Sequence, residues 1–190
     1  MTHDVSVLLS ELRQDHKNMA LMLNLLEREC NVIYDGNEPD YELLHDIMHY
    51  MTVYPDAVHH PKEDRIYAEL KAVRPDLAGG FARITLDHRK IAELGVKLRD
   101  EIASICSGGV VRRNTVVADG LRYVNTLRGH MQWEELDLFR RIEEMVAEGH
   151  GLIDATRTWG FADPVFGPEV EEKFGRLVTA IEVGREAGTI

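Results

Sequence analysis

The 190-residue sequence has only two cysteines, Cys30 and Cys106, which are too few for a disulfide framework and suit free thiols in a reducing cytosol. It has no apolar run near the ~20 residues that a bilayer span requires. Its N-terminus lacks a cationic segment ahead of an apolar one, so we expect no signal peptide. Basic residues are few, with 22 Lys and Arg against 33 Asp and Glu. This balance argues against nucleic-acid and membrane binding, and we expect a cytoplasmic protein.

What the sequence does have is helical periodicity over most of its length. Breaks rich in Gly and Pro leave four long segments joined by short connections, which favour antiparallel neighbours. We therefore predict an all-α fold, an up-down-up-down antiparallel four-helix bundle over residues 1–148. A C-terminal extension, residues 149–190, is expected to pack on it as a loop and a short extra helix. The expected helical segments are Asp4–Tyr34, Tyr41–Val73, Asp76–Cys106 and Val110–Glu148, with the extra helix at Glu169 to about Glu186.

The apolar face of every predicted long helix contains a polar, ionisable residue. In the third segment His88 follows Ile84 and precedes Ile91 at helical spacing, so it belongs to the core face. His16 has the same kind of position in the first segment. The second and fourth segments each carry a His and a Glu one turn apart, and a kink is expected at Pro55 in the second. The six residues concerned are His16, His59, Glu63, His88, His130 and Glu134.

These six side chains are expected to meet at one height in the bundle. Counted along antiparallel helices at ~1.5 Å per residue, most of them lie about 15–27 Å from the same end. A buried carboxylate without a cation costs several kcal/mol, and the core faces offer Glu63 and Glu134 no Lys or Arg. Imidazoles and carboxylates without thiolate suit iron or manganese, with iron first, and zinc is less favoured. The sequence therefore predicts a dinuclear centre bridged by carboxylates from two helices.

In chain order the pattern reads His16, then His59-His60-Pro-Lys-Glu63-Asp64, then His88, then His130-Met-Gln-Trp-Glu134-Glu135. It resembles the hemerythrin-like (HHE cation-binding) family in its H-HxxxE-H-HxxxE form, over residues 4–147. The resemblance implies a four-helix bundle that holds two iron ions (Fe2+/Fe3+), with oxo or hydroxo and carboxylate bridges. It also implies that the centre meets dioxygen (O2), hydrogen peroxide (H2O2) or nitric oxide (NO). The ligands that it implies are the six residues above.

One position departs from the oxygen-carrying proteins that this pattern resembles. Their third helix supplies two His four residues apart, whereas the residues four away from His88 are Ile84 and Ala92. One metal then has one imidazole fewer, and an open or substituted position favours turnover over reversible oxygen storage. Peroxide or nitric oxide chemistry of a catalase or peroxidase type, or sensing, is therefore expected rather than oxygen transport.

Three side chains close to the pattern are alternative donors. Tyr54 and Tyr123 are candidate phenolate ligands, although a core or outer position is the simpler interpretation of each. His60 could replace His59, paired with Asp64, if the proline kink rotates the helix. The residues alone leave these alternatives open.

Other hypotheses also stay open. A ferritin-like oxidase needs Glu-x-x-His from two helices, and only Glu42-Leu-Leu-His45 fits that pattern. A redox or oxygen sensor, or an iron-binding module without turnover, would pass a change at the metal to a partner through the C-terminal region. A plain structural bundle with buried His networks is the third hypothesis. Trp159, Phe161 and Phe166 would cap the bundle or form a dimer contact, so the sequence fits a monomer or a homodimer.

Overall fold

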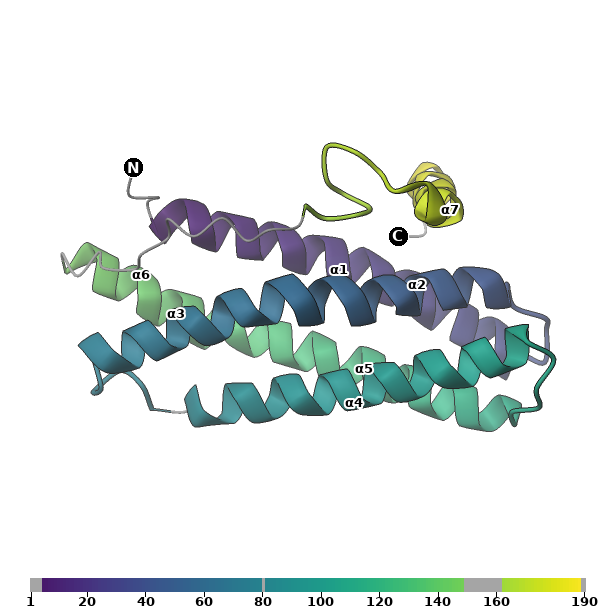
Figure 1. The fold of residues 1–190 in the computed structure, drawn as a ribbon, viewed down its shortest axis with the longest axis horizontal. Helices are drawn as coiled ribbons and strands as arrows, with labels where there is room; N and C mark the ends of the chain where they lie inside the picture. The colour runs from purple at the N-terminus through teal and green to yellow at the C-terminus, as the bar shows by residue number, and fades with distance from the viewer. Residues whose placement is uncertain (1–4, 80, 149–161, 189–190) are drawn as a thin grey trace.

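The computed structural model describes residues 5–79, 81–148 and 162–188, and all regular structure in these ranges is helical. Four rods lie lengthwise beside one another (Figure 1). The second and fourth rods are each interrupted by a single π turn. The elements are α1 Val5–Tyr34, α2 Tyr41–Tyr54, the π turn Pro55–His59, α3 His60–Val73, α4 Phe81–Cys106, α5 Arg113–Trp133, the π turn Glu134–Leu138, α6 Phe139–Ala147, the 3-10 turn Glu172–Phe174 and α7 Gly175–Glu186.

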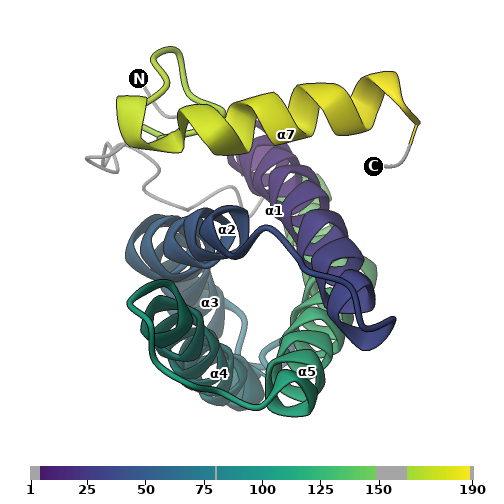
Figure 2. The same ribbon diagram turned by 90° about the vertical axis from the view of Figure 1, so that its right-hand side faces the viewer.

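The four rods surround a common core. α1 packs against α2 and α5, and α4 packs against α2 and α5, so each rod has two neighbours. Viewed end-on, α7 crosses outside this group beside α1 and α2 (Figure 2). In the described part of the chain, no helix combines the length and apolar character that crossing a membrane requires. The prediction of an all-helical bundle is confirmed for the described residues.

The links between rods carry local signals that end or begin helices. Gly36 and Gly108 follow α1 and α4 with φ of 83°, a left-handed conformation that glycine adopts without strain. At the start of α2, the Asp40 carboxylate accepts a hydrogen bond from the backbone N–H of Leu43 at 2.9 Å and caps the helix. These signals explain why the breaks could be located from the sequence.

Three predicted helix starts lie too early in the chain, and the smallest difference is in the fourth long helix, which was expected from Val110 and begins at Arg113. The third long helix was expected from Asp76 but begins at Phe81, because residues 75–77 form a turn. The extra helix was expected from Glu169 but begins at Gly175, after a short 3-10 turn. None of these differences moves a candidate ligand out of a helical rod.

The apolar core is divided into two halves by a polar layer. On α1, His16 lies between Leu12 in one half and Met19 in the other. On α4, His88 lies in the same way between Ile84 and Ile91. The smaller half includes Leu9, Leu12, Ile66, Ile84, Leu138 and Phe139, and the larger includes Met19, Leu26, Met48, Ile91, Leu98 and Leu127.

The described part of the C-terminal extension contacts α2. The Tyr50 hydroxyl donates to the Asp163 carboxylate at 2.9 Å, and Phe174 stacks on His49 with ring centroids 5.6 Å apart. Leu177 of α7 is fully buried in the larger half of the core. The division of the chain at residue 148 stays a prediction.

One of the three aromatic side chains named from the sequence can be placed. Phe166 is half-buried and meets the Tyr50 ring edge-on, with centroids 6.0 Å apart. It therefore lies against α2. Trp159 and Phe161 lie outside the described residues.

Helices α1 and α5 approach closely at Gly120, where an added methyl group would lie 2.5 Å from the Cys30 sulfur. Cys30 is fully buried, and burial raises the pKa of its thiol to about 12. We expect Gly120→Ala to lower the free energy of unfolding by about 1 kcal/mol, because overpacking of about 1–3 kcal/mol outweighs the helix propensity of alanine. In a Cys30→Ala background the same change should become neutral or stabilising. Urea unfolding measures both, and an equal loss in the two backgrounds would contradict this packing.

Candidate metal centre

All six candidate ligands come together in the polar layer. They form two groups of potential ligand atoms, and within each group the atoms lie within 4.8 Å of one another. Glu63 belongs to both groups, and Glu63 and Glu134 are both completely buried. The first group is His16, His59 and Glu63, and the second is Glu63, His88, His130 and Glu134.

A π turn lies beside each of the two His-x-x-x-Glu pairs. The backbone N–H of His60 bonds to the carbonyl of Pro55, and that of Phe139 bonds to the carbonyl of Glu134, each five residues back. Pro55 has no N–H to continue the α-helical ladder, which accounts for the first turn. The kink expected at Pro55 is therefore a π turn, and His59 is its last residue. π turns inside α-helices are frequent at functional sites.

Glu63 directs its two oxygens towards different imidazoles. Its Oε1 lies 3.3 Å from His59 Nε2 and 3.6 Å from His16 Nε2. Its Oε2 lies 3.5 Å from His88 Nε2. One carboxylate thus faces both groups.

Glu134 faces both groups in the same way. Its Oε2 lies 3.5 Å from His16 Nε2. Its Oε1 lies 3.2 Å from His130 Nε2 and 3.6 Å from His88 Nε2. The two carboxylates therefore span the gap between two pairs of imidazoles.

The spacing of these atoms suits cations better than direct hydrogen bonds. Most of the gaps exceed an ordinary hydrogen bond, and both Glu63 oxygens and the Nε2 atoms of His16 and His88 are buried without a hydrogen-bond partner. Adjacent donors placed at ~2.1 Å from one ion, at right angles, lie about 3 Å apart. In the described part of the chain, Glu63 and Glu134 form their ion pairs with imidazoles. These residues fit divalent or trivalent cations.

Outer carboxylates hold three of the imidazoles by their other nitrogen. An acceptor at Nδ1 places the proton there and leaves Nε2 free to bind a cation, with the ring held in orientation. The Nδ1 pairs are His16 with Glu135 at 3.0 Å, His59 with Asp15 at 3.1 Å and His88 with Asp64 at 3.2 Å.

Two buried tyrosines donate hydrogen bonds to carboxylates in the polar layer, one to an outer carboxylate and one to Glu134. The Tyr54 hydroxyl donates to Asp15 at 3.2 Å, so Tyr54 contacts the centre through the carboxylate that holds His59. The Tyr67 hydroxyl donates to Glu134 Oε1 at 3.2 Å. Burial raises the pKa of both phenols, which keeps them protonated as donors.

Sequence reasoning missed the acidic outer residues. Asp15, Asp64 and Glu135 each directly neighbour a predicted ligand in the chain. This adjacency in the sequence is the signal that could have identified them. A carboxylate next to a core-facing residue can reach the Nδ1 side of an imidazole on a neighbouring helix. Glu42 and His45, the ferritin-like pair, have side chains 67% and 41% exposed and lie outside the centre.

His60 and Tyr123, two of the alternative metal ligands named from the sequence, are both buried but have different surroundings. His60 is buried next to His59, and His59 keeps its Nε2 3.3 Å from Glu63 Oε1. Its Nδ1 is 3.1 Å from Asp56 Oδ1, so its partner is not the expected Asp64. Burial lowers the pKa of His60, which favours a neutral ring. Tyr123 is fully buried, and its ring faces the backbone of α4 at Gly95.

The two buried carboxylates control the protonation of the imidazoles around them. Burial alone would lower the pKa of His16 and His88, but the negatively charged Glu134 and Glu63 carboxylates, 3.5–3.6 Å from each Nε2, raise each to about 10. Burial alone would raise the pKa of Glu63, and the surrounding imidazoles lower it well below its usual value. Protons and metal cations therefore compete for the same atoms.

A pH dependence follows for protein stripped of metal by chelation. Because the folded-state pKa values of His16 and His88 lie near 10, above the ordinary 6.5, their stabilising protonation is complete below pH 6.5 and lost as pH rises towards 10. The free energy of unfolding in urea should fall over this range. His88→Gln should flatten the fall, whereas His45→Gln, on the exposed side of α2, should leave it unchanged. Equal slopes in all three proteins would contradict the coupling.

A surface pocket of about 280 Å³ borders the centre between α1 and α5. His16 and its partner Glu135 form part of its wall, and Lys17 and Arg128 are also part of its lining. A small molecule in this pocket lies beside a candidate ligand. The remaining lining residues are Ala20, Met131 and Gln132.

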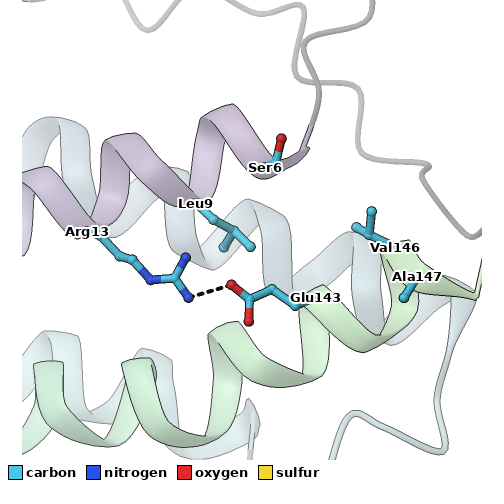
Figure 3. Close-up of a pocket in the computed structure, with 6 residues that line it drawn as sticks. All are labelled: Ser6, Leu9, Arg13, Glu143, Val146 and Ala147. Atoms are coloured by element: carbon cyan, nitrogen blue, oxygen red, sulfur yellow. Dashed lines mark hydrogen bonds and ion pairs between the residues drawn. The ribbon is translucent and has the colours of Figure 1, made fainter.

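A second pocket, of about 240 Å³, lies between the first turns of α1 and the end of α6 (Figure 3). Arg13 and Glu143 form an ion pair of 2.6 Å along it, and Leu9 supplies an apolar wall. The Arg13 guanidinium lies over the Phe139 ring at 5.4 Å, and that ring stacks on His16. Phe139 therefore stands between this pocket and the centre.

A helical bundle whose core holds buried imidazoles and shared carboxylates defines a class of cation-binding proteins. The protein-family model described as Hemerythrin HHE cation binding domain matches residues 7–122, more than half of the chain. The chain belongs to this family. No curated protein and no solved structure matches the chain. Because the family match ends before His130 and Glu134, the inclusion of these two residues depends on the geometry above.

Proposed function

We propose that this chain is a non-haem di-iron protein that binds or reacts with small oxidants. The observation that carries the proposal is that two completely buried carboxylates each direct one oxygen at each of two imidazole pairs. The core faces of the described helices carry no Lys or Arg that could neutralise these two carboxylates. Two cations bound between the carboxylates would neutralise their charge. In this assignment Glu63 and Glu134 bridge, His16 and His59 hold the first ion, and His88 and His130 hold the second.

Iron fits this donor set better than the other metals. Imidazole and carboxylate donors suit iron, no thiolate takes part, and zinc sites are usually satisfied by four ligands. Manganese and zinc are the less favoured occupants. When bound, a pair of irons would supply one-electron steps between Fe2+ and Fe3+. The protein residues then have to orient the ligands and supply protons.

Several side chains support chemistry with hydrogen peroxide or nitric oxide over oxygen transport. Tyr67 donates an O–H hydrogen bond to Glu134, and Tyr54 donates one to Asp15, the outer carboxylate of His59, so protic groups surround the centre where proton transfer between two peroxides would use them. Peroxide disproportionation requires no outside reductant, because one peroxide is oxidised to dioxygen while another is reduced to two waters. The pocket beside His16 provides access for a molecule of this size.

The experiment is anaerobic purification with metal counting, followed by optical spectra on separate addition of dioxygen, peroxide and nitric oxide. We expect about two irons per chain, as the two ligand groups require. Dioxygen release from peroxide would support an oxidoreductase of the catalase type. A fully reversible dioxygen spectrum without peroxide turnover would contradict the preference for turnover. A protein that takes up no iron would contradict the proposal as a whole.

A sensor without turnover is the second candidate function, and one network favours it. His59 is held by Asp15, which accepts from Tyr54. The Tyr54 ring stacks on Tyr50 at 5.8 Å, and Tyr50 donates to Asp163 of the C-terminal extension. A sensor should change the hydrogen exchange of residues 162–188 when the metal is oxidised. Unchanged exchange together with rapid peroxide turnover would exclude this role.

The arrangement of the chain completes the proposal. We infer an up-down-up-down order for the four rods, residues 1–148 as the bundle and residues 149–190 as an extension on it, which the short links and the α2 contacts support. A cytoplasmic location and a monomer or homodimer stay predictions. Sedimentation of the iron-loaded protein tests the oligomeric state.

A further inference from the structure

Two adjacent histidines, His59 and His60, both point into the core. Neighbouring residues of an α-helix diverge by about 100°, so only one of them normally faces the core. Here the π turn Pro55–His59 inserts one residue into the turn immediately before His60. The two side chains are 1% and 4% exposed. The irregular turn thus brings a second imidazole from the same rod to the polar layer.

The His60 ring has one satisfied nitrogen and one unsatisfied nitrogen. Its Nδ1 lies 3.1 Å from Asp56 Oδ1, while its Nε2 is buried without a hydrogen-bond partner. The ring stacks on His88 with centroids 4.2 Å apart and planes 17° apart. Ligand atoms of His60, His88 and His130 lie within 4.8 Å of one another. An unpartnered nitrogen in this position is unfavourable unless something binds to it.

The two ring nitrogens of His60 have the same kinds of surroundings as those of three candidate ligands. His16, His59 and His88 each have a carboxylate at Nδ1 and direct Nε2 to the centre. His60 has Asp56 at Nδ1 and a free Nε2 beside His88. A histidine that served only as core filler would need neither the outer carboxylate nor the shared position.

We propose that His60 is a ligand of the second ion, together with His88 and His130. This assignment rests on the proposed di-iron function and extends it. It supplies, from the second rod, the imidazole that Ile84 and Ala92 on the third rod do not provide.

The assignment also locates the position at which an exogenous ligand binds. With His60, the second ion has three imidazoles and two carboxylate oxygens, whereas the first has His16, His59 and two carboxylate oxygens. The residues would then offer the second ion one donor more than the first, so the first ion would be the one with room for an exogenous ligand. That ion is the one beside the pocket that His16 and Glu135 line.

The test compares wild type with His60→Gln and His60→Gly, and with His45→Gln as a control on the surface of α2. Iron is titrated anaerobically and counted, and the two iron environments are resolved by Mössbauer spectroscopy. We expect the second equivalent of iron to bind about tenfold or more weakly in both His60 variants, with the first equivalent retained. Added imidazole should restore the second equivalent in His60→Gly. The His45→Gln protein should match wild type.

Azide provides a second measurement on the same proteins. Wild type should bind one azide per iron pair, and His60→Gly loaded with two irons at high concentration should bind a second. Unchanged iron affinity, Mössbauer spectrum and azide stoichiometry in both His60 variants would overturn the assignment while leaving the di-iron function intact. A wild-type protein that binds no iron pair would overturn both. Circular dichroism of each variant checks folding, and rescue by imidazole would itself show a folded site.

Discussion

Replacing Glu63 with alanine is expected to remove iron from both positions and to lower the melting temperature at the same time. Its two oxygens face different imidazole groups, with Oε1 3.3 Å from His59 Nε2 and Oε2 3.5 Å from His88 Nε2. Loss of one bridging side chain therefore removes a donor from each ion. We expect iron content to fall by about tenfold or more, since even outer partners of ligands change affinity by about 10–100-fold. Metal analysis after gel filtration measures this loss.

The matched control is Glu69→Ala on the same helix. Glu69 is partly exposed and pairs with Arg65 at 2.9 Å, a contact whose loss costs about 0.5 kcal/mol or less. It should keep wild-type iron content. In the presence of a chelator, the difference in stability between wild type and Glu63→Ala should shrink, because the carboxylate then binds no metal ion. Full iron content in Glu63→Ala would refute its assignment as a bridge.

Removing the metal from wild type is expected to lower the melting temperature by about 8–16 °C. A ligand present at about 1,000 times its dissociation constant adds about 4 kcal/mol to folding, and about 2–4 °C corresponds to 1 kcal/mol in a chain of this size. The polar layer lies between two apolar halves, so the loss should affect the whole bundle.

Differential scanning calorimetry with and without chelator measures this effect. Readdition of ferrous iron under anaerobic conditions should reverse the shift, and Glu63→Ala should show little shift at all. A melting temperature that does not respond to chelation in wild type would contradict a structural role for bound metal. It would favour the hypothesis of a bundle with buried histidine networks.

The sequence predicted the bundle and the meeting of six side chains because periodicity and helix rise are local properties. His16 and His88 interrupt apolar faces at helical spacing, and both lie in the polar layer between the two halves of the core. The helix breaks at Gly36 and Gly108 were equally visible, because glycine readily adopts the positive φ that these turns use.

The sequence could not predict the π turns or their effect on side-chain direction. On a regular α-helix only one of the neighbours His59 and His60 would face the core. The residue that the π turn inserts after Pro55 allows both side chains to face inward. The outer carboxylates were missed for a related reason. Asp15 and Asp64 stand one residue away from a core-facing ligand on their own helices, and only the packing of the rods brings them to the rings of other helices.

The central claim is that two ions lie between the Glu63 and Glu134 carboxylates. X-ray absorption at the iron edge of the anaerobically loaded protein tests it most directly, in a sample whose iron and protein are both quantified. We predict about two irons per chain, nitrogen and oxygen donors only, and an iron neighbour within about 4 Å of each iron. A single isolated iron, sulfur in the ligand shell or no bound iron would contradict the account.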